Sequence, residues 1–145
     1  MRGFAHLGVL EVLQKERIPI LALAGSSAGA VAASAFAFGL QDPKRILEAV
    51  FDPEAAALSN QGRLQSLYRL LSSLRRPALL SGERVRVGVF KLFGEARLEE
   101  SPLPLRIQAA DLLTGEAVVL KEGRVAEAVL ASGAIPGVYP AVPLN

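Results

Sequence analysis

One serine in this sequence has neighbours that would let its hydroxyl act as a nucleophile. Residues 25–29 read Gly-Ser-Ser-Ala-Gly, a G-x-S-x-G pentapeptide with Ser27 at its centre and Ser26 before it. An apolar run at 18–24, long enough for a buried strand, precedes the pentapeptide, and a run of small helix formers follows at 30–37. A strand, a tight turn and a helix together make up a nucleophile elbow. We therefore predict that Ser27 is a catalytic nucleophile.

The glycines at the two ends of the pentapeptide support this interpretation. Gly25 and Gly29 would let the backbone turn sharply without a Cβ clash, so that Ser27 projects from the carboxyl end of the strand. Its hydroxyl would then face a helix N-terminus, where free N–H groups and the helix dipole favour negative charge. The alternative is a turn of small residues that only lets a helix pack closely on a sheet. The flanking strand and helix favour the nucleophile.

The composition excludes several other kinds of site. The chain has no cysteine, which rules out disulfides, thiolate metal sites and a cysteine nucleophile. His6 is the single histidine, so a multi-histidine metal site is excluded, and the ordinary α/β-hydrolase arrangement lacks the histidine it needs after the serine. There is no phosphate-binding glycine loop, and aromatic residues are not interleaved with the basic ones. We expect no metal, no cofactor and no nucleic-acid partner.

The elements expected around the serine alternate between helices and strands. The spacing of apolar residues predicts helices over 4–16, 28–38, 64–74 and 125–131, and strands over 20–25, 105–110 and 117–120. A further helix is predicted to start at Pro43, with Asp42 as its N-cap. Residues 82–93 fit both a strand and a helix, and we favour the helix. The last two strands are expected to form a hairpin. The 145 residues are thus predicted to be one domain, 1–145, with an α/β layered fold and a largely parallel sheet.

A long uncharged stretch raises the question of a membrane span. No residue from Ile18 to Gln41 is charged, which is long enough for a transmembrane helix. Pro19 and the glycines and serines after it argue against a span. Glu11 and Glu16, which precede the apolar run, argue against a secretory signal. We expect a cytoplasmic protein.

Basic residues are concentrated in one segment. Eight basic and two acidic residues lie between Arg63 and Arg97, whereas the whole chain carries a formal net charge of only +2. This asymmetry points to an anionic partner, and the leucine repeat at 64–74 with its arginines could lie on an anionic lipid surface as a peripheral membrane contact. The alternative is that the leucine repeat packs on the core of the domain.

Four blocks, in order along the chain, resemble the patatin-like phospholipase family. Residues 2–10 resemble its R-G-x-x-H-x-G-V-L block, and residues 18–30 resemble its elbow. Residues 110–116 and 131–140 resemble two further blocks. The similarity spans the whole chain and is greatest to the short bacterial members.

The resemblance implies a three-layer α/β/α fold and hydrolysis of lipid acyl esters by a Ser-Asp dyad, without a cofactor or a catalytic histidine. Ser27 would be the nucleophile. The oxyanion would be held by the Ala28 N–H and by an N-terminal glycine loop to which Arg2 and Gly3 belong. Arg2 would contact an anion beside the oxyanion site, and the alternative is that it is a solvated charge near the N-terminus. His6 matches a family histidine that has no catalytic role.

The sequence departs from the family pattern at both ends. Only Arg2 and Gly3 match the glycine-rich G-G-G-x-[KR]-G loop, and the strand before that loop is absent. The D-G-[GA] motif that carries the catalytic aspartate is not found before Asn145. We therefore expect an incomplete hydrolase domain whose catalytic aspartate lies outside this chain. The alternative is a truncated, non-catalytic domain that binds lipid or a partner.

The aspartates present in the chain are poor substitutes for the missing one. Asp42 is better explained as a helix cap, and Asp52 precedes a proline at a helix end. Asp111 follows a strand, in a turn where its carboxylate is expected to accept N–H bonds of the hairpin as an Asx turn.

Overall fold

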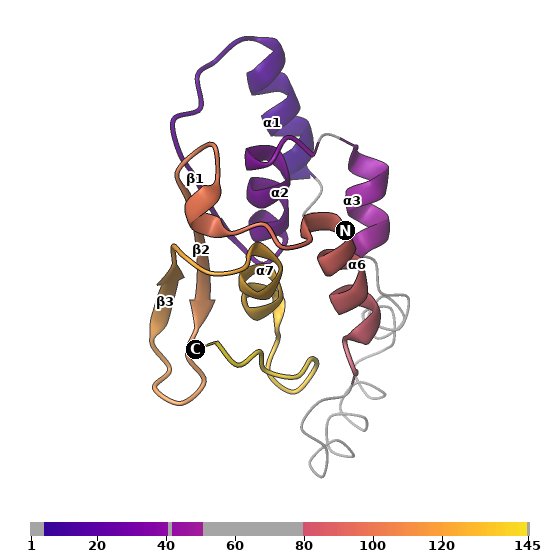
Figure 1. Ribbon diagram of the computed structural model, residues 1–145, viewed down its shortest axis with the longest axis vertical. Helices are drawn as coiled ribbons and strands as arrows, with labels where there is room; N and C mark the ends of the chain where they lie inside the picture. The colour runs from indigo at the N-terminus through magenta and orange to yellow at the C-terminus, as the bar shows by residue number, and fades with distance from the viewer. Residues whose placement is uncertain (1–4, 41, 51–79, 145) are drawn as a thin grey trace.

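The computed structural model describes residues 5–40, 42–50 and 80–144 of the chain (Figure 1). The helices and strands within these residues are, in chain order, α1 (Ala5–Lys15), β1 (Leu23–Ser26), α2 (Ala28–Ala37), α3 (Pro43–Val50), α6 (Glu83–Phe93), the 3-10 helix η3 (Leu98–Glu100), β2 (Leu105–Ala110), β3 (Ala117–Leu120) and α7 (Val125–Gly133).

The three strands form one mixed sheet in the order β1-β2-β3. β1 runs parallel to β2, with Leu23 opposite Leu105 and Ser26 opposite Gln108. β2 and β3 pair antiparallel, which confirms the predicted hairpin. Because parallel neighbours end at the same edge of a sheet, the end of β1 lies beside the end of β2.

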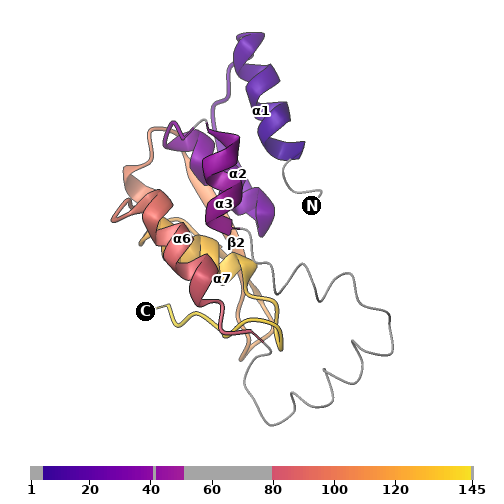
Figure 2. The ribbon, with the colours of Figure 1, turned by 90° about the vertical axis from the view of Figure 1, so that its right-hand side faces the viewer.

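Helices cover one face of this sheet. In β2, buried and exposed residues alternate: Leu105 and Ile107 are fully buried, whereas Arg106 and Gln108 are exposed. This alternation is expected because successive side chains of a strand point to opposite faces of the sheet. α2 packs on β1 and α7 packs on β2, whereas α6 packs on α7 and α3 packs on α6. Figures 1 and 2 show the resulting order from the sheet through α2 and α7 to α3 and α6.

Small side chains allow this close packing. α2 is buried along almost its whole length, and its buried residues are alanines except for Val31 and Ser34. A Cβ added at Gly88 of α6 would collide with the carbonyl oxygen of Ala49, so α3 and α6 approach each other through a glycine. Larger side chains from α3, α6 and α7 complete the core, among them Ile46, Leu92, Phe93, Val125 and Val129.

Most of the predicted elements that fall within the described residues are confirmed. The ambiguous segment 82–93 is helical, as α6. Asp42 caps α3, because its Oδ1 accepts a hydrogen bond from the Lys44 N–H at 3.0 Å. β1 begins at Leu23 rather than at residue 20, and α7 extends two residues beyond the predicted end. The leucine repeat at 64–74 lies outside the described residues.

No helix in the ranges that the structure describes is long and apolar enough to cross a membrane.

Candidate active site at the end of β1

Ser27 occupies the turn between β1 and α2. β1 ends at Ser26, α2 begins at Ala28, and Ser27 between them has φ 52° and ψ −121°. Among the described residues, Arg17 is the only other non-glycine residue with a positive φ. A serine in this region is strained, and such strain persists only where the surrounding structure enforces it. The backbone therefore has the strained strand-to-helix turn that the pentapeptide predicted.

The two glycines of the pentapeptide have different roles. A Cβ at Gly25 would collide with the carbonyl of Gly29 and would lie 2.6 Å from the Ala30 nitrogen, so the end of β1 touches the start of α2 there. A Cβ at Gly29 would meet nothing within 4 Å, and the φ of Gly29 is not positive. The predicted steric requirement for glycine thus holds at Gly25 and is wrong for Gly29.

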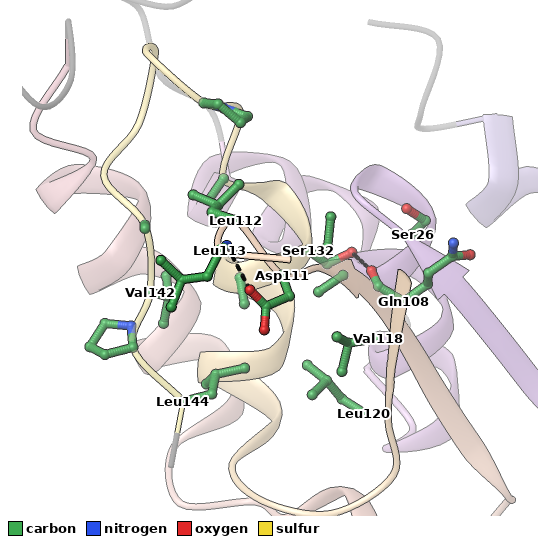
Figure 3. A pocket seen from close by; sticks show the side chains of 17 residues that line it. Ser26, Gln108, Asp111, Leu112, Leu113, Val118, Leu120, Ser132, Val142 and Leu144 are labelled. Carbon is green, nitrogen blue, oxygen red and sulfur yellow. Dashed lines mark hydrogen bonds between the residues drawn. The ribbon is translucent and has the colours of Figure 1, made fainter. Parts of the chain in front are cut away.

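A second serine, from a distant part of the chain, contacts the elbow. Ser132 of α7 accepts a hydrogen bond from the Ser27 N–H at 2.8 Å. Its hydroxyl donates a second one to the Gln108 carbonyl oxygen at 2.5 Å (Figure 3). Sequence reasoning missed this residue. Ser132 does lie in the block at 131–140, one of the four that resemble the patatin-like family. Nothing in the sequence around it, however, indicates a contact with Ser27.

The start of α2 offers unpaired donors. The Ser27 carbonyl accepts bonds from the N–H groups of Ala30 (2.9 Å) and Val31 (3.3 Å). The Ala28 N–H is bonded to no acceptor within the described residues. Free N–H groups at a helix N-terminus favour an oxyanion. Arg2 and Gly3, the other predicted oxyanion residues, lie outside the described ranges.

A cavity of about 830 Å³ lies beside the elbow (Figure 3). Ser26, Gln108 and Ser132 line it at the elbow end, although Ser27 itself is exposed and is not among the lining residues. The other walls are mainly apolar and come from the β2–β3 hairpin, the end of α7 and residues 141–144; they include Leu112, Leu113, Val118, Leu120, Val142 and Leu144.

Asp111 also lines the cavity, but its carboxylate is engaged in the hairpin turn. Its Oδ1 accepts bonds from the N–H groups of Leu113 (2.7 Å) and Thr114 (3.2 Å), and its carbonyl accepts one from Gly115 (2.8 Å). The predicted Asx turn is confirmed. Within the described ranges, no hydrogen bond joins the Ser27 side chain to an acid or a base.

The resolved pKa shifts lie outside the cavity lining. On α6, a side-chain hydrogen bond between Glu83 and Arg86 lowers the pKa of the carboxyl and raises that of the guanidinium. For Glu99, a hydrogen bond from its own backbone N–H is the largest cause of a lowered pKa, followed by one from Arg97. No group of three or more metal-ligating side chains is found in the part of the chain that the structure describes.

The comparisons with known proteins identify the family of this chain. A strained serine between a parallel strand and a helix is the arrangement of a nucleophile elbow. The model of the patatin-like phospholipase family matches residues 1–145, so the chain belongs to that family. The predicted fold class is confirmed: this is the patatin fold, with helices and a small mixed sheet.

The names of similar proteins indicate the activity of the family. An uncharacterized NTE family protein of Mycobacterium tuberculosis is 33% identical over 94% of this chain and 35% of its own length. A second from that organism is 33% identical over 97% of this chain and 22% of its own length. Lysophospholipase nte1 of Emericella nidulans is 27% identical over 97% of this chain and 9% of its own length. The chain thus spans about a third or less of these relatives, and the family is one of lipid acyl hydrolases.

Proposed function

We propose that this chain carries the nucleophile of a serine lipid acyl hydrolase, of the phospholipase or carboxylic ester hydrolase type, and that Ser27 is that nucleophile. The observation that carries the proposal is the backbone of Ser27. A serine held at φ 52° between a parallel strand and a helix, with an exposed side chain, has the backbone arrangement of a nucleophile elbow.

The reaction would proceed through an acyl-enzyme. The Ser27 Oγ attacks the ester carbonyl carbon while a base takes the hydroxyl proton, and the carbonyl oxygen becomes an oxyanion. The Ala28 N–H at the start of α2 would donate to that oxygen, with the loop that includes Arg2 and Gly3 supplying further donors. The alcohol leaves with a proton, and water then releases the fatty acid from Ser27.

The base would be an aspartate of a D-G-[GA] motif beyond this chain. This assignment rests on the resemblance and on the engagement of Asp111, whose Oδ1 is held by two backbone N–H groups. The apolar cavity beside the elbow would take the acyl chain, because its volume falls within the usual range for ligand pockets and its walls are mostly aliphatic.

We further propose a cytoplasmic, peripheral contact with anionic membranes. Arg84 and Lys91 are exposed on α6, and neither has an ion-pair partner among the residues that the structure describes. With Arg86 and Arg97, which are ion-paired with Glu83 and Glu99, they are the described basic residues of the segment from Arg63 to Arg97. Residues 63–79 of that segment lie outside the described ranges.

Ester hydrolysis tests the main proposal. We expect the 145 residues alone to cleave a p-nitrophenyl acyl ester at barely detectable rates, because one missing oxyanion donor typically costs about a hundred- to a thousand-fold. A version extended to include the glycine loop and a D-G-[GA] aspartate should be active, and Ser27→Ala should abolish its activity. Ser34→Ala is the matched control, since that buried hydroxyl of α2 has no hydrogen-bond partner within the described residues.

The competing function is a non-catalytic domain that binds lipid or a partner. It is favoured by the observation that no described acid or base is hydrogen-bonded to the Ser27 side chain. An inactive extended protein, or an extended Ser27→Ala variant as fast as its parent, would replace the hydrolase with this function.

A further inference from the structure

The hydrogen bonds between β1 and β2 follow a two-residue period that reaches Ser27. The Leu23 N–H donates to the Pro104 carbonyl at 2.8 Å, and the register advances one residue at a time from Leu23 opposite Leu105 to Ser26 opposite Gln108. In a parallel pair, every second residue of a strand donates to the partner strand in this way. The next bonds of the series would therefore run from Gly25 to Arg106 and from Ser27 to Gln108.

The last of these bonds is bridged by a side chain instead of being direct. The Ser132 hydroxyl accepts a hydrogen bond from the Ser27 N–H at 2.8 Å. The same hydroxyl donates a hydrogen bond to the Gln108 carbonyl oxygen at 2.5 Å (Figure 3). The two backbone groups that a continuing strand would join are thus both satisfied by one hydroxyl inserted between them. Ser132 belongs to α7, which packs on β2 and on α2.

We infer that Ser132 is a positioning residue for the nucleophile: its hydroxyl ends the β1–β2 pairing at the point where the chain must leave the sheet, and so holds Ser27 in its strained turn. This inference rests on the proposed role of Ser27. It assigns Ser132 no contact with substrate. The hydroxyl acts on the backbone of Ser27, because it engages the N–H of that residue while the Ala28 N–H remains available for an oxyanion.

Two features of the site indicate that the backbone conformation of Ser27 depends on the Ser132 hydroxyl. A serine at φ 52° does not stay there unless neighbouring contacts enforce the conformation. The contact at Gly25 fixes the distance between β1 and α2, but it does not fix the distance between Ser27 and β2. Ser132 supplies that second restraint, from an element 105 residues away in sequence.

Amide exchange tests the geometry without reference to catalysis. We expect Ser132→Ala to accelerate exchange of the Ser27 amide proton, measured by NMR, by about 5-fold or more, which is the effect of losing one typical hydrogen bond. Ser132→Thr keeps a hydroxyl at the same branch point and should exchange within about twofold of the parent. Ser34→Ala, which removes a buried hydroxyl of α2, should leave the Ser27 amide unchanged. Unaltered exchange in Ser132→Ala would overturn the inference.

Kinetics of the extended, active protein test the consequence for the nucleophile. Displacing a reacting group by about 1 Å can cost a hundred-fold, so we expect Ser132→Ala to lower kcat by about 10- to 100-fold with little change in KM. Ser132→Thr should restore most of the rate. A threonine variant as impaired as the alanine variant would contradict a role for the hydroxyl. If Ser27→Ala leaves the rate unchanged, the proposed function fails, while the exchange experiment still decides the role of Ser132.

Discussion

At the scale of single residues, the site depends on where side chains are absent as much as on where they are present. Ser27 projects from the turn because β1 and α2 meet without a side chain between them at Gly25. Gly29, in the same motif, has open space around the position of its missing side chain, at the start of α2. Two glycines that look equivalent in the pentapeptide therefore carry different physical requirements.

The two glycine positions make a matched pair for mutation. Gly25→Ala should lower the free energy of unfolding by about 1 to 3 kcal/mol, because its Cβ meets backbone atoms that cannot move aside without shifting α2. Gly29→Ala should be neutral or gain up to about 1 kcal/mol, since alanine favours a helix more than glycine does. Urea unfolding followed by circular dichroism measures both changes. Equal destabilisation by the two variants would show that the close contact at Gly25 is not what the turn requires.

At the scale of elements, a carboxylate ties η3 to the turn before α7. Glu99 accepts a bond from the Arg97 Nε at 2.7 Å and one from the Gly123 N–H at 2.8 Å. The backbone of Ala96 also accepts a bond from the Val125 N–H at 2.9 Å, so two segments far apart in sequence meet here. These contacts help to place α7, and with it Ser132.

The lowered pKa of Glu99 gives this link a pH dependence with a definite sign. Its own backbone N–H, followed by Arg97, favours the charged form in the folded protein, so the contribution to stability is present above the unfolded-state pKa and is lost as pH falls through the folded value. Glu99→Gln should therefore lower the melting temperature at pH 7, and the difference from the parent should shrink towards pH 3. Thermal unfolding at several pH values measures this. A difference that stays constant with pH would contradict the assignment.

The sequence was enough to predict those parts of the structure that depend only on residues close together in the chain. The elbow follows from small residues between an apolar run and an alanine run, and the cap at Asp42 and the Asx turn at Asp111 follow from short-range hydrogen bonds. Ser132 could not be predicted, because its bond to Ser27 depends on how α7 docks on the sheet. The later start of β1 has a similar cause, since Leu23 begins the strand only by pairing with Leu105 of a distant segment.

At the scale of the whole molecule, the helical layer farthest from the sheet carries exposed positive charge. The helices α3 and α6 lie on the side of α2 and α7 that is remote from the sheet (Figures 1 and 2). Exposed basic side chains of α6, at Arg84 and Lys91, therefore lie on an outer layer where a membrane could reach them.

Vesicle binding should reflect these charges. We expect binding to rise with the fraction of anionic lipid and to weaken with salt, because exposed charges are screened beyond roughly 10 Å at 0.1 M ionic strength. Cosedimentation with vesicles measures it. The double variant Arg84→Glu/Lys91→Glu should bind less than Lys15→Glu/Lys121→Glu, which makes the same change in net charge at exposed positions on α1 and after β3. Equal binding to neutral and anionic vesicles would leave only packing roles for the basic segment.

The bridged bond between Ser27 and Gln108 also limits how the gene can change in length. Inserting or deleting one residue between Leu105 and Gln108 would turn every later side chain of β2 to the opposite face and present a different carbonyl to Ser132. The hairpin turn from Asp111 to Glu116 lies beyond this bond, so a change of length there leaves the register of β1 and β2 intact. Descendants of this sequence can therefore vary the hairpin turn while keeping the spacing from Leu105 to Gln108 fixed.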